Sequence, residues 1–358
     1  MRVAFLSYTP AAGGVSTFQS LHIQWLHEQG VQVALIDEDP VHTLAPLPND
    51  VAAGLEIQRL PLWRDRRRAA SDLRQWLAAW RPKLVHLSNP ALVLMYTAEL
   101  QQARRAGCKT VLTQHSEILV PTWRRALMAA GSSVASLALH EITYVSAYTR
   151  RWWERRFPWL HLTNARVTPN GFPPALGAQR AHTPGNPVRV GFVGRLSREK
   201  GITRFLEVAR AADPEHFRFI VFGDGEARDL VQASPAVTWR GQELDRDRIF
   251  AELDLLLVTS PVENCPFAVL EARAFGIPTV AAAVGGLPEL ISPGVDGELS
   301  LTTRTSDLLQ ALDRAVEAYA SLARGCLKSR ERWTFELAAR RLWGPYIPLP
   351  QAVSEVGA

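Results

Sequence analysis

Cysteine, long apolar runs and targeting segments are scarce or missing in this sequence. The three cysteines, Cys108, Cys265 and Cys326, stand far apart and predict neither a disulfide framework nor a metal-binding cluster. No run approaches the ~18 apolar residues of a membrane-spanning helix. The N-terminal run from Met1 to Ser7 is short and unlike a signal peptide. These absences argue against secreted and membrane-spanning classes, and we expect a cytoplasmic protein.

The composition is that of a globular chain with room for two domains. The 358 residues are 47% hydrophobic and 21% charged, which allows sizeable cores. The net charge of +5 is uneven: residues 1–172 hold 19 Lys and Arg against 12 Asp and Glu, whereas residues 173–358 hold 21 against 23. The basic first half predicts an anionic partner such as a phosphorylated or lipid-linked acceptor, an anionic bilayer or nucleic acid.

Strand-like apolar runs alternate with amphipathic helical stretches in two blocks. The predicted strands are 3–7, 31–36, 84–87, 110–113 and 142–145, then 188–193, 217–222, 237–239, 255–259 and 279–282. Between the blocks, residues 171–188 carry three Gly and four Pro, a linker composition. We therefore predict an α/β protein with two doubly wound, Rossmann-like domains, 1–172 and 173–335, that bind ligands in the cleft between them.

The segment from Pro261 to Glu271 (Pro-Val-Glu-Asn-Cys-Pro-Phe-Ala-Val-Leu-Glu) follows a predicted buried strand and opens a helix. Pro266 suits the first helical position and Gly276 suits the end. The free N–H groups and positive dipole of such a helix start suit a diphosphate. Glu263 stands where it can face a sugar, and Glu271 can accept hydrogen bonds from ribose hydroxyls. The alternative for either glutamate is a solvated side chain beside a capped helix.

The two glutamates resemble the E-x7-E motif of glycosyltransferase family 4, a retaining family with the GT-B fold. The residues that follow, through Gly285-Gly286-Leu-Pro-Glu, are also similar to the family pattern. The resemblance implies that Glu263 contacts the donor sugar and Glu271 the nucleotide ribose. It implies further donor contacts from Asn264, Cys265, Phe267, Ala268 and Val269. Many members carry a glycine-containing run at 264–267, so the donor sugar and its base, UDP- or GDP-linked, stay open.

Arg195 and Lys200, five positions apart, follow the strand at 188–193 in Gly194-Arg195-Leu-Ser-Arg-Glu-Lys200-Gly. The Arg fork and the Lys point charge can converge on one diphosphate, and the alternative is a solvated basic turn. The segment resembles the family's G-R-x-x-x-x-K-G pattern, which implies that Arg195 and Lys200 stabilise the departing phosphate. Gly223 in Phe-Gly-Asp-Gly and Arg240 in Trp-Arg-Gly resemble less specific family positions near the nucleotide and its base.

In the first half, Gly13-Gly14 follows the first strand and His115 ends the strand at 110–113. The glycines could form only a tight turn, and a lone His is more often structural than catalytic. The resemblance implies that the glycine loop approaches the donor phosphate and that His115 contacts the transferred sugar. It also implies that a C-terminal helix, at about 336–350, packs back on the first domain.

The resemblance implies metal-independent, retaining transfer of a hexose from a nucleotide sugar to a glycan, glycolipid or small-molecule hydroxyl, as in bacterial-type glycoconjugate synthesis. Cleavage of the anomeric C–O bond requires a stabilised diphosphate, which the helix start with Arg195 and Lys200 can supply. Acidic spots at 37–39, 224 and 245–247 are interpreted as loop or cap residues. We therefore expect no metal and no cofactor beyond the co-substrate.

Trp and Arg are interleaved at 62–68, 123–128 and 150–157. Such segments suit an anionic bilayer, so the inner face of the membrane is a candidate peripheral location. Half-buried Trp beside solvated Arg is the simpler alternative. No nucleic-acid partner is expected, because no recognised binding module occurs.

Three other functions stay open. The first is an epimerase or phosphorylase on the same fold, and the second is a catalytically silent sugar-nucleotide-binding protein. The third is a dinucleotide-dependent oxidoreductase that uses Gly13-Gly14 and Asp37, although the G-x-G-x-x-G fingerprint is missing.

Overall fold

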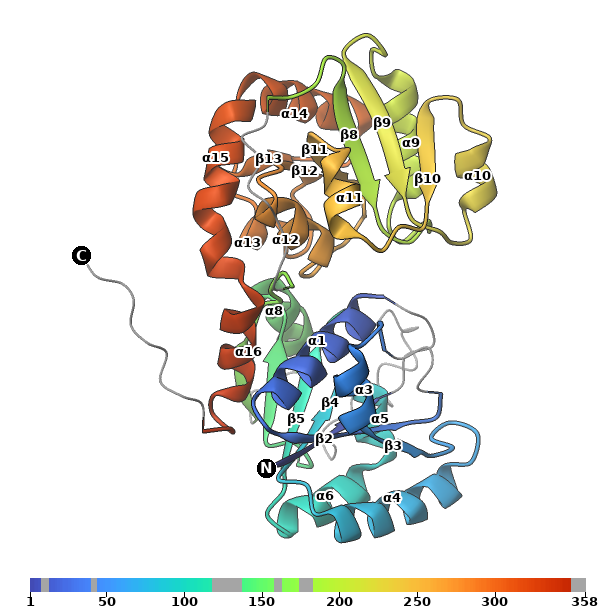
Figure 1. Ribbon diagram of the computed structural model, residues 1–358, viewed down its shortest axis with the longest axis vertical. Helices are drawn as coiled ribbons and strands as arrows, with labels where there is room; N and C mark the ends of the chain where they lie inside the picture. The colour runs from blue at the N-terminus through green and yellow to red at the C-terminus, as the bar shows by residue number, and fades with distance from the viewer. Residues whose placement is uncertain (8–12, 40–43, 118–136, 158–162, 174–182, 349–358) are drawn as a thin grey trace, which may run out of the picture. The chain divides into compact units, whose positions relative to one another are not determined.

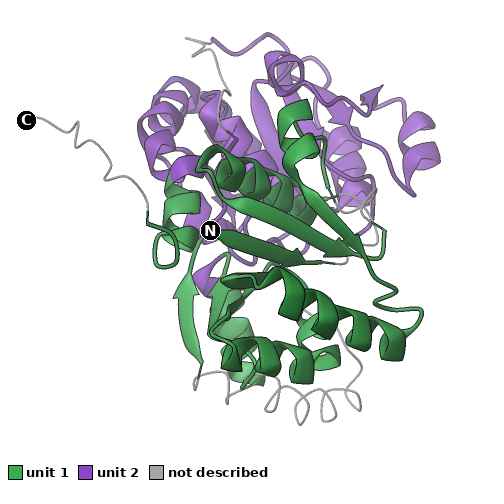
Figure 2. Cartoon of the chain, turned by 60° about the horizontal axis from the view of Figure 1, so that its bottom comes forward, with its two compact units in different colours: residues 1–145, 149–168, 337–358 green, residues 146–148, 169–336 purple. Residues whose placement is uncertain are grey.

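A computed structural model describes residues 1–7, 13–39, 44–117, 137–157, 163–173 and 183–348 (Figure 1). The chain divides into two compact units, coloured separately in Figure 2. Unit 1 comprises residues 1–145, 149–168 and 337–358, and unit 2 comprises 146–148 and 169–336. Each unit is built on its own parallel sheet.

The sheet of unit 1 has seven parallel strands in the order β3-β2-β1-β4-β5-β6-β7. The strands are β1 (Arg2–Leu6), β2 (Gln32–Asp37), β3 (Glu56–Arg59), β4 (Leu84–Leu87), β5 (Lys109–Gln114), β6 (Glu141–Tyr144) and β7 (Asn164–Val167). The chain winds outward from β1 to β3 and then restarts at β4 on the other side of β1. This reversal is a topological switch point, the place where doubly wound sheets bind ligands.

The helices of unit 1 lie between these strands along the chain, except for the last helix, which follows unit 2. They are α1 (Gly14–Glu28), α3 (Asn49–Gly54), α4 (Arg66–Trp80), α5 (Pro90–Met95), α6 (Thr97–Arg105), α8 (Ala147–Arg156) and α16 (Phe335–Trp343). The chain returns to unit 1 through α16, whose Trp343 is fully buried. Its indole Nε1 donates a hydrogen bond to Nδ1 of His22 on α1, 2.8 Å away. The buried Trp343 ring and its hydrogen bond to His22 therefore hold α16 against α1.

The sheet of unit 2 has six parallel strands in the order β10-β9-β8-β11-β12-β13. The strands are β8 (Val188–Val193), β9 (Phe217–Phe222), β10 (Val237–Gly241), β11 (Leu255–Val258), β12 (Thr279–Ala282) and β13 (Gly297–Ser300). The helical segments are α9 (Ile202–Ala211), α10 (Arg228–Gln232), α11 (Arg246–Ala251), α12 (Phe267–Ala274), α13 (Leu287–Leu290), α14 (Thr305–Glu317), α15 (Tyr319–Ser329) and the 3₁₀ turn η2 (Arg330–Trp333). The switch point lies between β8 and β11.

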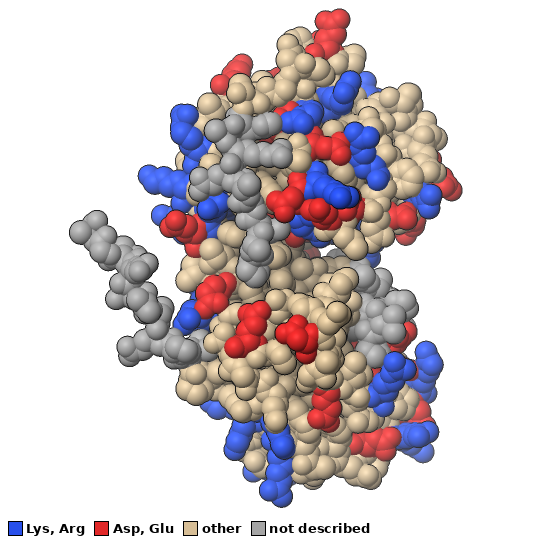
Figure 3. Space-filling model, in the orientation of Figure 1, with Lys and Arg blue, Asp and Glu red and all other residues tan. Residues whose placement is uncertain are grey.

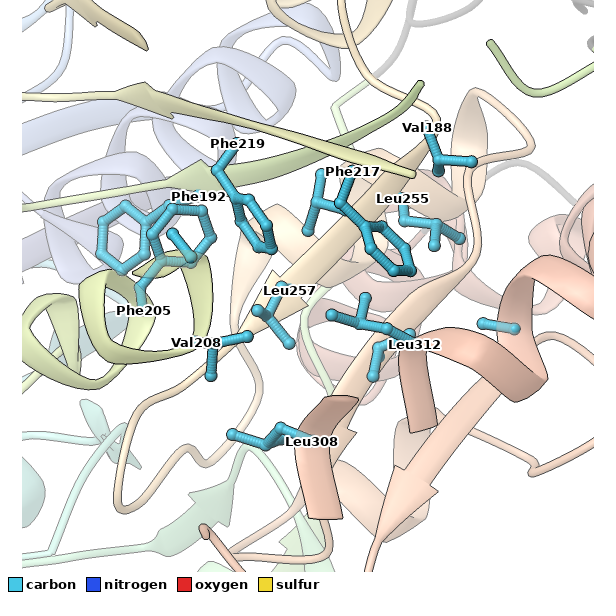
Figure 4. Close-up of a cluster of buried hydrophobic side chains, with 14 of the residues drawn as sticks. Val188, Phe192, Phe205, Val208, Phe217, Phe219, Leu255, Leu257, Leu308 and Leu312 are labelled. Atoms are coloured by element: carbon cyan, nitrogen blue, oxygen red, sulfur yellow. The ribbon is translucent and has the colours of Figure 1, made fainter. Parts of the chain in front are cut away.

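A cluster of buried side chains between the sheet of unit 2 and helices α9 and α14 forms its core (Figure 4). Phe205 on α9 packs edge-on against Phe192 of β8 and Phe219 of β9, with ring centroids 5.4 and 5.5 Å apart. Edge-to-face pairs of this kind stabilise beyond the area they bury. The packing holds β8 and β9 rigidly, and with them the loops that follow each strand.

The prediction of two doubly wound, Rossmann-like α/β domains is confirmed. Each predicted strand occurs within about two residues of its expected ends. Strands β3, β7 and β13 were not predicted, and all three lie at the edge of a sheet. β3 and β7 are too polar for an apolar run to mark them. Pro266 is the N-cap residue of α12 and not its first helical residue, because its ψ of 131° is extended.

Candidate active site

The loops that follow β8 and β11 meet at the switch point of unit 2. Nζ of Lys200 lies 2.7 Å from Oε1 of Glu263, so two predicted site residues form an ion pair. Oγ of Ser260 lies 2.8 Å from the same carboxylate oxygen and 3.2 Å from the main-chain oxygen of Lys200. The Glu263 side chain is 9% exposed and that of Lys200 43%. The carboxylate is held inward, whereas the Lys200 side chain is partly open to solvent.

Two predicted glycines, Gly285 and Gly286, fix the backbone around Glu263. A Cβ on Gly285, whose φ is +60°, would lie 2.0 Å from the main-chain oxygen of Glu263. The N–H of Gly286 donates to that oxygen at 2.6 Å, and a Cβ on Gly286 would lie 2.0 Å from the oxygen of Asn264. Only glycine allows this approach. The Gly-Gly-Leu-Pro-Glu segment therefore supports the loop that carries Glu263.

Glycines also bring the other strand ends together. A Cβ on Gly223, after β9, would lie 1.9 Å from the main-chain oxygen of Gly194, after β8. A Cβ on Gly201 would lie 2.1 Å from the oxygen of Thr259, after β11. The loops after β8, β9 and β11 thus pack backbone against backbone at the carboxyl edge of the sheet.

Helix α12 begins at this same edge, directly after the Glu263 loop. Its N-cap, Pro266, supplies no side-chain hydrogen bond, so the first N–H groups of the helix have no cap from that residue. Phe267 and Ala268 are half-buried, whereas Val269 and Cys265 are buried. Burial raises the pKa of the Cys265 thiol to about 12, so it stays protonated near neutral pH and is a poor nucleophile.

Glu271 lies one turn into α12, and its side chain is 3% exposed. Burial raises the pKa of this carboxyl, and Arg246 on α11 opposes the shift. Nε of Arg246 lies 3.1 Å from Oε1 of Glu271. Sequence reasoning missed Arg246, because nothing in the order of residues relates a helix start to a position 25 residues later.

The remaining predicted donor residues lie around this edge. Arg195 is exposed on the loop after β8. Arg240 on β10 pairs with Glu252, with Nη2 and Oε2 2.6 Å apart. Asn170 donates from Nδ2 to the main-chain oxygen of Cys265 at 2.8 Å, a support that the sequence did not indicate.

In unit 1, His115 directly follows β5 and is half-buried. Burial lowers its pKa to about 3, so the imidazole is neutral at physiological pH. Its ring packs edge-on against Phe18 of α1, with centroids 4.5 Å apart. Its Nε2 is buried and has no hydrogen-bond partner within the described residues. A buried, unsatisfied ring nitrogen is uncommon and favours a role toward a ligand.

Polar side chains gather at the switch point of unit 1. Nε2 of Gln19 on α1 lies 2.5 Å from Oγ of Ser7 and 3.2 Å from Oγ of Ser88, at the ends of β1 and β4. The predicted Gly13 is the N-cap of α1, and Gly14 is its first residue. The sequence did not mark Gln19, Ser7 or Ser88, which lie together only because β1 and β4 are neighbours.

The Trp-Arg segments differ in exposure. Trp152 and Trp153 of α8 are buried, and Arg156 stacks on Trp152 with its Cζ 4.0 Å from the ring centroid. This segment therefore follows the simpler alternative of buried Trp beside Arg. Trp63, by contrast, is 41% exposed. Residues 123–128 lie outside the described part of the chain.

The described residues show neither a metal-binding cluster nor a membrane-spanning helix. No group of three or more His, Cys, Asp and Glu side chains there is placed to hold a metal ion. None of the described helices combines the length and apolarity needed to cross a membrane.

Comparison with known sequences identifies both halves of the chain. Residues 12–176 match the family described as Glycosyltransferase Family 4, and residues 187–318 match that described as Glycosyl transferases group 1. Over 358 aligned residues the chain is 26% identical to a GDP-mannose-dependent alpha-mannosyltransferase of Mycobacterium tuberculosis (strain CDC 1551 / Oshkosh). That alignment covers 92% of this chain and 93% of the relative.

Solved structures agree on the fold. HepE of Anabaena, crystallised with UDP and glucose, superposes with a TM-score of 0.77 at 18% identity, covering 97% of this chain and 99% of that one. Sucrose-phosphate synthase of Thermosynechococcus elongatus gives 0.75 at 19% identity, covering 96% and 98%. The fold is the GT-B architecture. The chain is a glycosyltransferase, whose first half matches family 4 and whose second half matches group 1.

Proposed function

We propose that the enzyme transfers a hexose, with retention of anomeric configuration, from a UDP- or GDP-linked donor to a hydroxyl of a bacterial-type glycoconjugate acceptor. The Lys200–Glu263 ion pair at the switch point of unit 2 is the observation that carries the proposal. A cation and a carboxylate there suit the two parts of a nucleotide sugar, its diphosphate and its sugar hydroxyls. The relative named as a GDP-mannose-dependent enzyme supports this donor class.

Donor binding would rearrange the ion pair. The half-exposed ammonium of Lys200 turns to the diphosphate, where Arg195 and the start of α12 add positive charge. Glu263 then accepts hydrogen bonds from the hydroxyls of the transferred sugar. As the anomeric C–O bond breaks, the fixed positive groups stabilise the charge that develops on the leaving diphosphate. No metal is required for that stabilisation.

The other predicted residues receive matching roles. Glu271 accepts hydrogen bonds from the ribose, and Gly13, Gly14, Gly194, Gly223, Arg240 and residues 264–269 complete the donor contacts. His115 is neutral at physiological pH and contacts the transferred sugar. We further propose that residues 173–335 bind the donor. Residues 1–172, with the C-terminal helix, bind the acceptor.

We also propose that unit 1 meets an anionic surface, such as the inner face of the membrane or a lipid-linked acceptor. The exposed arginines of α4 and α6 support this, and Lys and Arg side chains are visible at the lower end of Figure 3, where these helices lie. Arg67 and Arg105 are exposed, and Arg74 pairs with Glu99 across the two helices at 3.7 Å. Liposome flotation with and without anionic lipid tests it, and no binding at low salt would disprove the membrane surface.

The donor proposal is tested with the purified protein and a panel of UDP- and GDP-sugars. A rise in the unfolding temperature identifies the donor, and nucleoside diphosphate release that depends on an acceptor distinguishes transfer from phosphorolysis, epimerisation or silent binding. Glu263→Gln keeps the shape and removes the charge, and we expect it to lose most transfer. Glu199→Gln is the matched control, because Glu199 is an exposed glutamate on the loop after β8. Undiminished transfer by Glu263→Gln would disprove the role of Glu263.

A further inference from the structure

Arg246 lies outside the family motifs quoted above, but it pairs with Glu271, the second glutamate of the E-x7-E motif. The pair joins the first residue of α11 to a residue of α12, with Arg246 Nε and Glu271 Oε1 3.1 Å apart. The side chain of Glu271 is 3% exposed and that of Arg246 31%. One partner is therefore inside the unit, and the other reaches it from the surface.

A carboxyl buried this deeply needs a cation to stay ionised. Burial favours its neutral form, and Arg246 is the cation that opposes this. The protonation state of Glu271 matters for recognition, because an ionised carboxylate only accepts hydrogen bonds, whereas a protonated carboxyl group also donates one. A pair of ribose hydroxyls, both donating, is matched by the ionised form.

The ion pair is described by one carboxylate oxygen. Arg246 Nε approaches Oε1, and no second cation pairs with Glu271 among the described residues. Oε2 can then accept from a ligand hydroxyl without breaking the pair. Because the guanidinium is planar and rigid, it also restricts rotation of the carboxylate.

Helix α11 is held where this contact requires it. The Asp245 side chain caps the helix by accepting hydrogen bonds from the N–H groups of Asp247 and Arg248, at 2.9 and 3.3 Å. One turn later, Phe250 stacks on Phe275, the C-cap residue of α12, with centroids 5.0 Å apart and ring planes at 25°. The cap and the stack set the position of α11 against α12 independently of the ion pair.

We propose that Arg246 is a positioning residue for nucleotide recognition, which keeps Glu271 ionised and oriented so that its open oxygen accepts the ribose hydroxyls. The inference rests on the proposed contact between Glu271 and the ribose. Arg246 itself acts through Glu271 and is assigned no contact with the nucleotide.

The test compares two ligands that differ only in the ribose. Calorimetric titration measures the affinity of the full chain for UDP and GDP and for their 2′,3′-dideoxy analogues. Hydrogen bonds to a charged acceptor predict that the wild type prefers the better ribonucleotide over its dideoxy form by about tenfold or more. In Arg246→Gln we expect this preference to fall to about twofold, and Arg246→Lys should restore part of it. Arg248→Ala, at the exposed neighbouring arginine, should keep the wild-type ratio.

Each outcome decides a different statement. If the wild type binds neither nucleotide, the proposed donor class is wrong. If it binds them but does not discriminate against the dideoxy forms, the ribose role of Glu271 is wrong. The third case is a wild type that prefers the ribonucleotide over its dideoxy form. If Arg246→Gln then keeps the same ratio of affinities, or loses affinity for both ligands equally, Arg246 is only structural. Arg246→Met, of similar length, provides a second uncharged variant, and thermal unfolding confirms that each variant is folded.

Discussion

Replacing Lys200 with Met should separate stability from activity. The substitution keeps the length of the side chain and removes the ammonium that lies 2.7 Å from Glu263. Because the Lys200 side chain is 43% exposed, solvent screens the pair and its contribution to stability is about 1 kcal/mol at most. Ser260 still offers a hydrogen bond to the Glu263 carboxylate, which limits the cost further.

The expected effect on transfer is much larger. Loss of one fixed positive group from a developing oxyanion typically lowers kcat by about 10²–10³. We therefore expect Lys200→Met to unfold within a few degrees of the wild type while kcat falls by about two orders of magnitude. Lys200→Arg keeps the charge and should recover part of the rate.

Initial-rate kinetics and thermal unfolding of the same preparations measure both quantities. Arg198→Ala is the control, because Arg198 is an exposed cation two residues before Lys200. Two results would refute the reasoning. One is a Lys200→Met variant whose kcat for transfer equals that of the wild type. The other is a loss of rate that only follows a loss of folded protein, because it would assign Lys200 to the structure alone.

Three further predictions concern the glycine support, the pH dependence and metals. Gly285→Ala places a Cβ within 2.0 Å of the main-chain oxygen of Glu263 at a φ of +60°. We therefore expect urea unfolding to show destabilisation by about 1–3 kcal/mol, together with loss of transfer. Wild-type stability of this variant would contradict the close backbone packing. Burial lowers the pKa of His86 and His115 to about 3, below the ~6.5 of an unfolded chain. As pH falls below ~6.5, the unfolded state therefore binds protons that the folded state does not, and the free energy of unfolding should drop by about 2 kcal/mol per histidine between pH 7 and 5. Equal urea midpoints at the two pH values would show that these rings are not buried. Treatment with EDTA should leave transfer unchanged, and a loss restored by Mg²⁺ or Mn²⁺ would overturn the metal-independent mechanism.

The local order of residues was enough to predict the two-sheet architecture. Buried parallel strands such as β8, β9 and β11 are mostly apolar runs, and a glycine follows β8 and β9 directly. The same local signals placed Glu263 before a helix and Glu271 inside it, because both follow from their distance to the strand at 255–258. Strand β3 was not predicted, because an exposed edge strand has no apolar run to mark it.

Only the tertiary structure decided which of these residues meet. Lys200 and Glu263 are 63 positions apart and pair because β8 and β11 are neighbours at a switch point, an arrangement that spacing along the chain does not encode. Arg246 reaches Glu271 because two phenylalanines stack α11 on α12. The neutral state of His115 depends on burial beside Phe18 from another element. Residue types and their local order thus specified the elements and the chemistry available, whereas charge states and pairings came from packing between segments far apart in the chain.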